Sequence, residues 1–137
     1  MHPEDLLKIL LALAVGAAVG FERELHHKSA GLRTLIFICL GSTLFTILSG
    51  RLAGSGDDFT RIASGIVTGV GFLGAGVILH DGGHIKGLTT AAAIWLVAAL
   101  GMGIGAGQYA LVGAVTVVTL LVLWLFPRVE AWIDRRK

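Results

Sequence analysis

The sequence predicts an all-α integral membrane protein, a bundle of five transmembrane helices in a single domain over residues 1–137. First, 55% of the residues are hydrophobic, only 15% are charged and the mean hydropathy is +0.83, whereas soluble domains average about 25% charged residues. Second, the charges are bunched, and the longest uncharged run, residues 87–127, has 41 residues. A helix needs about 20 residues to cross a bilayer, so this run is long enough for two crossings. Third, glycines recur at G-x-x-x-G spacing, which is typical of helices that pack closely in lipid.

The first predicted span covers about residues 6–22 and is interrupted only by Lys8. Acidic residues precede it and Arg23 follows it, which is the reverse of the charge order of a secretory signal peptide. Gly16 and Gly20 form a G-x-x-x-G pair on this span. We therefore expect a transmembrane helix that packs through its glycines.

The second predicted span covers residues 34–50, and the third, residues 62–79, is rich in glycine. Each helical glycine costs about 1 kcal/mol relative to alanine, so we expect neighbours to approach this helix closely on more than one side. We interpret it as the central helix of the bundle. Its G-x-x-x-G pair, like that of the first span, predicts either packing within the chain or homodimerisation. The glycines assigned to helix packing or dimerisation are Gly16, Gly20, Gly65, Gly69, Gly71, Gly74 and Gly76.

The fourth predicted span covers residues 88–102, and the fifth covers residues 109–126. Glycine at alternate positions from Gly101 to Gly107 makes a poor helix interior, so we expect the turn between the spans there. Pro127 is expected to end the last span. The basic tail that follows is suited to the membrane interface.

Five spans place the two termini on opposite sides of the membrane, and the basic residues divide unequally between those sides. One side receives Lys8, Arg51 and Arg61, and the other receives Arg23, Lys28, Arg33, Lys86, Arg128, Arg135, Arg136 and Lys137. The positive-inside rule then predicts an outward N-terminus and a cytoplasmic C-terminus.

A faint internal repeat has an offset of 56 residues. Gly31-Leu32 aligns with Gly87-Leu88, and Thr34 aligns with Thr90. Both halves read as helix, loop, G-L-x-T, helix, which indicates a parallel repeat of two hairpins.

A polar cluster is expected at the cytoplasmic ends of the helices, where ionisable groups near membrane depth tend to be functional. Its members are Glu22, Arg23, Glu24, Arg33, Thr34, Lys86 and Thr90. One interpretation is a site that binds an ion or an acidic segment of a partner. The other, equally favoured, is an ion-pair network that holds the first hairpin together.

Metal sites and catalytic sites have less support. His80, Asp81 and His84 could ligate a transition metal, but a fourth ligand is missing and a solvated turn is favoured. Arginines beside the carboxylates of the polar cluster oppose Mg²⁺ binding. Cys39 is expected to fill the core. We find no nucleophile–base pair, no cofactor motif and no basic aromatic face for nucleic acid, so we expect no enzyme, no cofactor and no nucleic-acid partner.

Several stretches together resemble the MgtC/SapB family of bacterial membrane proteins, across residues 5 to about 125. They are Gly20–Glu24, Ala30–Thr34, Arg61–Ala63, Gly69–Ile78 and Lys86–Ala92. The chain departs from the family pattern at Leu35, where histidine is common, and at Gly65, where glutamine is common. The resemblance is to the short form of the family, which consists of the transmembrane domain alone.

The resemblance implies an inner-membrane protein associated with magnesium limitation, stress and virulence. It implies a non-enzymatic modulator that contacts other membrane proteins. The glycine faces indicate in addition a homo-oligomer, with a dimer favoured. The alternative is a small transporter or channel subunit, for magnesium or another ion, that forms its pathway by oligomerising. No predicted span has acidic residues lining its middle, as cation pathways commonly do.

Overall fold

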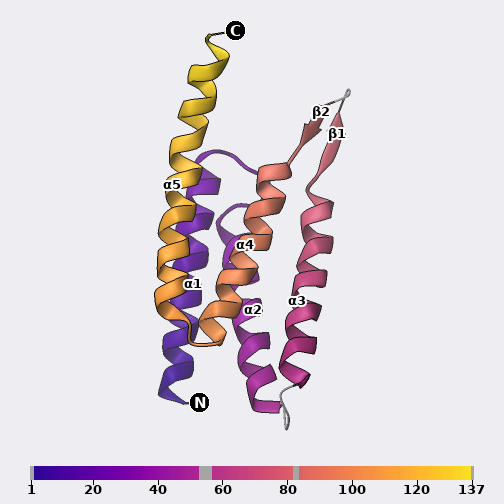
Figure 1. Ribbon diagram of the computed structural model, residues 1–137, viewed down its shortest axis with the longest axis vertical. Helices are drawn as coiled ribbons and strands as arrows, with labels where there is room; N and C mark the ends of the chain where they lie inside the picture. The colour runs from indigo at the N-terminus through magenta and orange to yellow at the C-terminus, as the bar shows by residue number, and fades with distance from the viewer. Residues whose placement is uncertain (1, 53–56, 82–83, 137) are drawn as a thin grey trace.

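The computed structural model describes residues 2–52, 57–81 and 84–136. Its elements are α1 (Pro3–Leu25), α2 (Leu32–Leu52), α3 (Asp57–Gly76), β1 (Leu79–Asp81), β2 (His84–Lys86), α4 (Leu88–Gly105) and α5 (Tyr109–Asp134). Successive helices run in alternating directions, so the two termini lie at opposite ends of the bundle (Figure 1). The α1–α2 connection and the hairpin lie at the same end as the C-terminus (Figure 1). We call this end the hairpin end.

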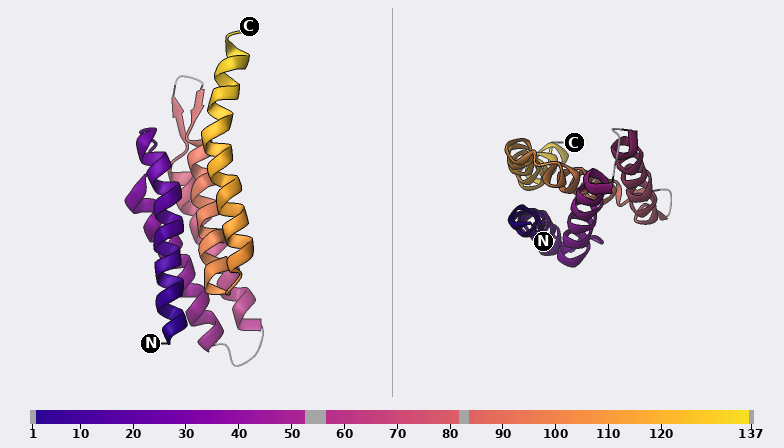
Figure 2. Two further views of the ribbon diagram at one scale, coloured as in Figure 1. Left: turned by 90° about the vertical axis from the view of Figure 1, so that its left-hand side faces the viewer. Right: turned by 90° about the horizontal axis from the view of Figure 1, so that it is seen from below.

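Helices α2 and α4 lie in the middle of the bundle, with α1 and α5 on one side and α3 on the other (Figure 2). The expectation that the glycine-rich third helix is central is therefore wrong. Gly65, Gly69, Gly71 and Gly76 have open space where a side chain would start, and Gly74 has only ordinary contacts with Ala91. The glycines of α3 do form a helix surface without side chains. The sequence pattern does not say which other helix, if any, packs on that surface.

Close packing does occur where α1 meets α2, through the first predicted glycine pair. A Cβ atom added at Gly16 would lie 2.8 Å from the Ile36 Cα, and one added at Gly20 would lie 2.8 Å from the Leu32 Cα. Carbon atoms that are not bonded cannot approach so closely, so these two positions accept only glycine without movement of α2. Small residues that let backbones meet in this way are a main source of helix association in lipid.

The contact between α2 and α4 uses a second glycine pair that sequence analysis assigned to a turn. A Cβ atom at Gly101 would lie 2.4 Å from the Cys39 carbonyl oxygen, and one at Gly105 would lie 2.6 Å from the Thr46 Cβ. The Thr43 hydroxyl also donates a hydrogen bond of 2.9 Å to the Gly101 carbonyl. Helix α4 thus continues to Gly105, and the low helix propensity of its glycines is offset by contact with α2.

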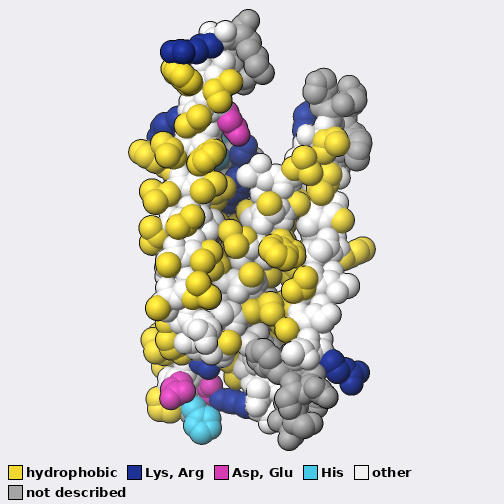
Figure 3. Space-filling view, viewed as in Figure 1, with side chains coloured by type: hydrophobic (Ala, Val, Ile, Leu, Met, Phe, Trp, Pro, Cys, Tyr) yellow, Lys and Arg dark blue, Asp and Glu magenta, His cyan; other side chains and the backbone are white. Residues whose placement is uncertain are grey.

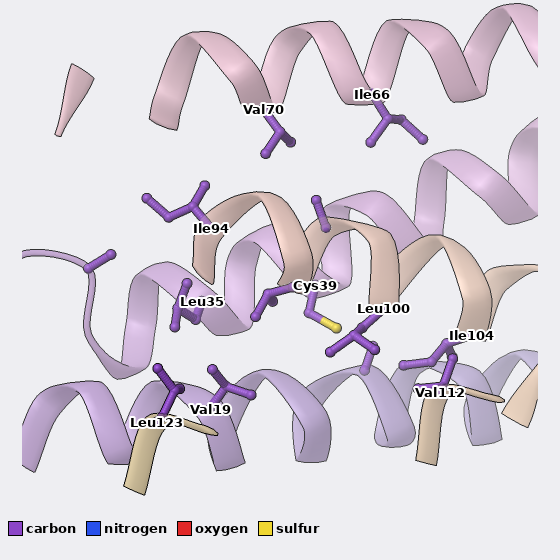
Figure 4. Packing of buried hydrophobic residues seen from close by; sticks show 14 residues of the cluster. Val19, Leu35, Cys39, Ile66, Val70, Ile94, Leu100, Ile104, Val112 and Leu123 are labelled. Carbon is purple, nitrogen blue, oxygen red and sulfur yellow. The ribbon is translucent and has the colours of Figure 1, made fainter. Parts of the chain in front are cut away.

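The apolar core fills the space around α2 and α4 (Figure 4). Leu35 and Cys39 of α2 have no exposed surface, and Cys39 fills the core as expected. The other buried hydrophobic side chains of the cluster come from the other four helices and from the α1–α2 connection: Ala12, Val19, Ala30, Ile66, Val70, Ile94, Val97, Ala98, Leu100, Ile104, Val112 and Leu123.

Among the described residues, three helices are long and apolar enough to cross a membrane by length and composition: α2, α4 and the stretch Tyr109–Ile133 of α5. Helix α1 carries acidic and basic residues near both ends, and α3 begins with two aspartates and Arg61. Large hydrophobic side chains are widely exposed, and on one face they cover the middle of the bundle while charged side chains gather toward its ends (Figure 3). In water this surface would be unfavourable, and in a bilayer it is the expected one.

Several predicted boundaries are shifted. Helix α3 covers residues 57–76 instead of 62–79, and the predicted loop after it contains an antiparallel hairpin in which Leu79 pairs with Lys86. Helix α5 continues through Pro127 to Asp134. A proline removes one backbone hydrogen bond from a helix, and the Arg128 side chain donates from Nη1 to the Trp124 carbonyl in the turn that Pro127 disturbs.

The internal repeat corresponds to equivalent helix starts. Helix α2 begins at Leu32 and α4 begins at Leu88, each directly after the glycine of G-L-x-T. The second of these glycines, Gly87, has a left-handed φ of 91°, and a Cβ there would lie 2.1 Å from the Val77 carbonyl oxygen. Only glycine fits this position without strain.

Exchanging glycines for alanine tests which helix contacts are tight. We expect Gly101→Ala to lower the free energy of unfolding, because overpacking costs about 1–3 kcal/mol and exceeds the gain in helix propensity of about 1 kcal/mol. The matched control is Gly113→Ala on α5, where nothing lies within 4 Å; this change should leave stability unchanged or raise it. Unfolding in detergent, followed by circular dichroism, measures both, and equal stability of the two variants would contradict the packing described.

Candidate functional site

A buried arginine links α1 to α4 at the hairpin end. Arg23 lies in the last turn of α1, and its Nη2 donates a 2.8 Å hydrogen bond to the Thr90 hydroxyl in the first turn of α4. Each residue is only 4% exposed. A buried guanidinium needs partners because an unsatisfied charged donor is costly in a medium of low polarity. The structure therefore brings together two residues of the predicted polar cluster that lie 67 positions apart.

Glu24 holds the start of α2. Its Oε2 accepts a 3.0 Å hydrogen bond from the Leu32 backbone N–H. A carboxylate at a helix N-terminus is favourable because the first N–H groups of a helix have no partner within it. A Cβ at Gly31 would lie 1.8 Å from the same carboxylate oxygen, so the glycine of the first G-L-x-T makes room for this cap.

Glu22 and Arg23 both keep unpartnered atoms. The Glu22 Oε1 lies 3.0 Å from the His26 Nδ1, while its Oε2 and the Arg23 Nε are buried without a hydrogen-bond partner. No ion pair joins these two residues in the part of the chain that the structure describes. The ion-pair network predicted for the first hairpin therefore takes a different form, in which its charged groups bind hydroxyl, backbone and imidazole partners.

The remaining members of the predicted cluster do not enter this buried arrangement. Arg33 and Thr34 are exposed in the first turn of α2, although Thr34 is the repeat equivalent of the buried Thr90. Lys86 is exposed on β2. The two repeats thus differ in their threonines, because only the α4 threonine faces the C-terminal end of α1.

A second polar cluster lies at the opposite end of the bundle and was not predicted. Arg51 at the end of α2 forms an ion pair with Asp5 at the start of α1. The Lys8 Nζ donates a 2.8 Å hydrogen bond to the Gly105 carbonyl near the end of α4. The hydrogen bond from Arg51 lowers the pKa of Asp5, so this carboxylate stays ionised at neutral pH.

These groups line a cavity of about 610 Å³ between the ends of α1, α2 and α4. The one feature of the sequence that indicates this second polar cluster is Lys8, a charged residue inside an otherwise apolar span. Such a charge needs a partner. Its partner, a carbonyl 97 residues away, is not visible in the sequence.

The third feature is an apolar groove between α2 and α3, with a volume of about 780 Å³. We call it the α2–α3 groove. The residues that line it include Phe37, Gly41, Phe45, Gly65, Gly69 and Leu73. All three glycines have open space at their Cα atoms, so the groove floor is backbone on both sides. The predicted pair Gly65 and Gly69 thus faces this groove, whereas Gly16 and Gly20 are covered within the chain.

The possible metal ligands considered in the sequence were two histidines and one aspartate. The structure does not describe the side chains of these residues, His80, Asp81 and His84. Among the described residues, no group of three or more potential ligands of the His, Cys, Asp or Glu type could hold a metal ion. Hydroxyl groups on the helices mainly bond to their own helix, as for Thr116, which donates to the Val112 carbonyl at 2.7 Å. Such bonds are the usual arrangement for threonine inside a helix.

The link between α1 and α4 is testable by changing its acceptor. We expect Thr90→Val to lower the free energy of unfolding by about 1–3 kcal/mol, because the buried Arg23 guanidinium loses its hydroxyl partner. Thr90→Ser retains the hydroxyl and should have a much smaller effect. Unfolding in detergent measures both variants, and a valine variant as stable as wild type would show that the hydrogen bond contributes nothing to the fold.

The sequence of this chain is similar to that of a known family of proteins. The model of the MgtC family matches residues 9–132. The chain is 47% identical over 133 residues to the Escherichia coli K12 protein named "Putative magnesium transporter YhiD", covering 92% of this chain and 62% of that protein. It is 40% identical over 111 residues to "Protein MgtC" of Brucella abortus, covering 81% of this chain and 46% of that protein. It is 41% identical over 115 residues to "Protein MgtC" of Salmonella typhimurium, covering 84% of this chain and 49% of that protein.

The chain thus spans less than two thirds of the length of these relatives. No solved structure matches it. The match over nearly the whole chain, together with relatives that share 40–47% of aligned residues, shows that this membrane protein belongs to the MgtC family.

Proposed function

We propose that this protein is a non-enzymatic modulator in the bacterial inner membrane that acts by binding transmembrane helices of other proteins and of a second copy of itself. The α2–α3 groove carries the proposal. It is apolar, and its floor is formed by glycines. In lipid, a helix surface without side chains is the kind of surface against which another helix packs.

The contrast between glycine pairs supports this role. Gly16 and Gly20 are covered by α2, and Gly101 and Gly105 also contact α2, so those pairs serve the fold of the chain. A Cβ atom added at either glycine of the pair in α3 would meet no atom of the described residues within 4 Å, although glycines there cost helix stability as much as they do elsewhere. A helix from another molecule would make contacts that offset this cost.

A homodimer is the assembly we favour, because two copies can place their α3 helices against each other's grooves about a two-fold axis. Such isologous contacts are the commonest route to closed oligomers. The membrane placement proposed with it has five crossings, an outward N-terminus and a cytoplasmic C-terminus. It is supported by the exposed apolar helix surfaces and by the unequal distribution of basic residues.

The names of the relatives connect the proposal to magnesium. One relative is named for magnesium transport, and the resemblance to the family implies a role in magnesium limitation and in stress or virulence adaptation. We propose that the protein adjusts other membrane machinery under these conditions.

Filling the groove tests the assembly. We expect Gly69→Leu to reduce the yield of chemically crosslinked dimers in membranes by about tenfold or more. The reason is that the leucine occupies the space of the partner helix. Gly113→Leu is the matched control, since its Cα also has open space but lies on α5. Both variants should insert and fold as wild type, as judged by circular dichroism. Unchanged crosslinking in Gly69→Leu would contradict an interface at this groove.

The second candidate function is ion transport by an oligomer, which the name of the Escherichia coli relative favours. The buried guanidinium of Arg23 at the hairpin end opposes it, because a positive charge repels a divalent cation. We expect protein reconstituted into liposomes to give no saturable Mg²⁺ flux above that of empty liposomes. Robust, saturable uptake reported by an enclosed magnesium indicator would make transport the better account.

A further inference from the structure

Tryptophan and arginine alternate at intervals of four residues through the end of α5 and the turn that follows it. The guanidinium carbon of Arg128 lies 3.9 Å from the centroid of the Trp124 ring, and that of Arg136 lies 3.9 Å from the centroid of the Trp132 ring. Residues four apart are neighbours on a helix surface, so each arginine can lie over the ring one turn before it. Contacts of this kind are cation–π interactions, which fix the plane and position of the guanidinium.

The C-terminal end of α5, which includes Trp132, extends beyond the other helices (Figures 1 and 2). With a rise of about 1.5 Å per residue, Trp132 lies about 35 Å along the helix from Tyr109. The hydrocarbon core of a bilayer is about 30 Å thick, and the headgroup layer follows directly. Since α5 is one of the apolar candidate spans, a core that begins near Tyr109 places the Trp132 ring and the stacked Arg136 guanidinium at headgroup depth.

The two pairs differ in the donors that remain available. Arg128 already donates from Nη1 to the Trp124 carbonyl. Arg136 has no ion pair with a carboxylate among the described side chains, and it is exposed. Stacking covers the face of a guanidinium and leaves the N–H groups at its edge free to bind. Arg136 is thus held by Trp132 with its donors directed away from the ring.

A phosphate group is the partner that this arrangement fits. The planar guanidinium presents its N–H groups in a fork that matches two oxygens of a phosphate. Trp132 is 54% exposed and Ile133 is 44% exposed, so the phosphate site has an apolar border. Tryptophan is enriched at the membrane–water interface, where its ring lies beside headgroups. Charge and depth together favour a phosphate that is attached to an acyl chain.

We propose that Trp132 and Arg136 form a binding site for the phosphate headgroup of an anionic phospholipid, with Trp132 in the interface and Arg136 on the phosphate. The site is distinct from the α2–α3 groove and does not depend on the partners proposed for it. It gives α5 a specific lipid contact, whereas a basic segment without stacking would attract anionic lipids only diffusely.

The test uses Trp132 as its own reporter. The chain has three tryptophans, so the substitutions Trp95→Phe and Trp124→Phe leave Trp132 as the only source of tryptophan fluorescence. The full chain is reconstituted into phosphatidylcholine vesicles with one quarter phosphatidylglycerol, and either lipid carries bromine near its headgroup at the same mole fraction. We expect brominated phosphatidylglycerol to quench Trp132 about twofold or more above brominated phosphatidylcholine, because the site concentrates the anionic lipid.

Two neighbouring arginines provide the matched comparison. Arg136→Gln should abolish the excess quenching, whereas Arg135→Gln removes the same charge beside it without removing a stacked guanidinium and should retain most of the excess. Equal losses in both variants would show diffuse attraction and overturn the proposal. Equal quenching by the two lipids in the parent protein would also overturn it, and would be the result if this surface bound a protein instead. Circular dichroism establishes that all variants are folded.

Discussion

The close approach of backbones through glycine is the constraint on which the rest of this structure depends. Gly16, Gly20, Gly101 and Gly105 each bring α2 within a distance that excludes any side chain. Lipid tails are as apolar as leucine, so burying hydrophobic side chains does little to hold membrane helices together. Contacts between backbones, with hydrogen bonds such as that from Thr43 to Gly101, take over that role. The central position of α2 follows, because both glycine pairs pack against it.

This constraint also explains the arrangement of the polar groups. The glycine contacts fix the axial positions of α1 and α4 against α2, and this places the end of α1 beside the start of α4. Arg23 can then reach Thr90, and Lys8 can reach the Gly105 carbonyl at the other end. Two of the charged residues at the ends of the apolar segments thus find a partner on another helix. A change in packing at a glycine would leave them without partners in a medium where an unsatisfied charge is costly.

The sequence predicted the helical class, the family, the approximate helices and the packing role of Gly16 and Gly20, because each depends on local pattern. It also identified Arg23 and Thr90 as members of one cluster, since the charge distribution placed both at the same end. It did not predict that Gly101 and Gly105 lie in a helix. Their low propensity indicated a turn, but tertiary contact with α2 overrides propensity. It also misplaced α3, because an exposed glycine face and a covered one have the same spacing.

The continuation of α5 past Pro127 was wrongly excluded for a related reason. The rule that proline ends a helix counts the backbone bond that Pro127 cannot donate to the Leu123 carbonyl, but the loss of this one bond does not end α5, which continues to Asp134. Partners that are distant in sequence, such as Asp5 and Arg51, cannot be paired by periodicity. They require the helix order and the axial positions that only the folded chain supplies.

The hydrogen bond between Arg23 and Thr90 joins the first helical hairpin to the second. Many carriers with repeated hairpins work by rocking one half against the other around a central substrate. In this protein such a rocking movement would have to separate α2 from Gly101 and Gly105 while it withdrew a buried guanidinium from its acceptor. These contacts therefore oppose any separation of α1, α2 and α4, whereas α3 flanks the open groove and takes no part in them.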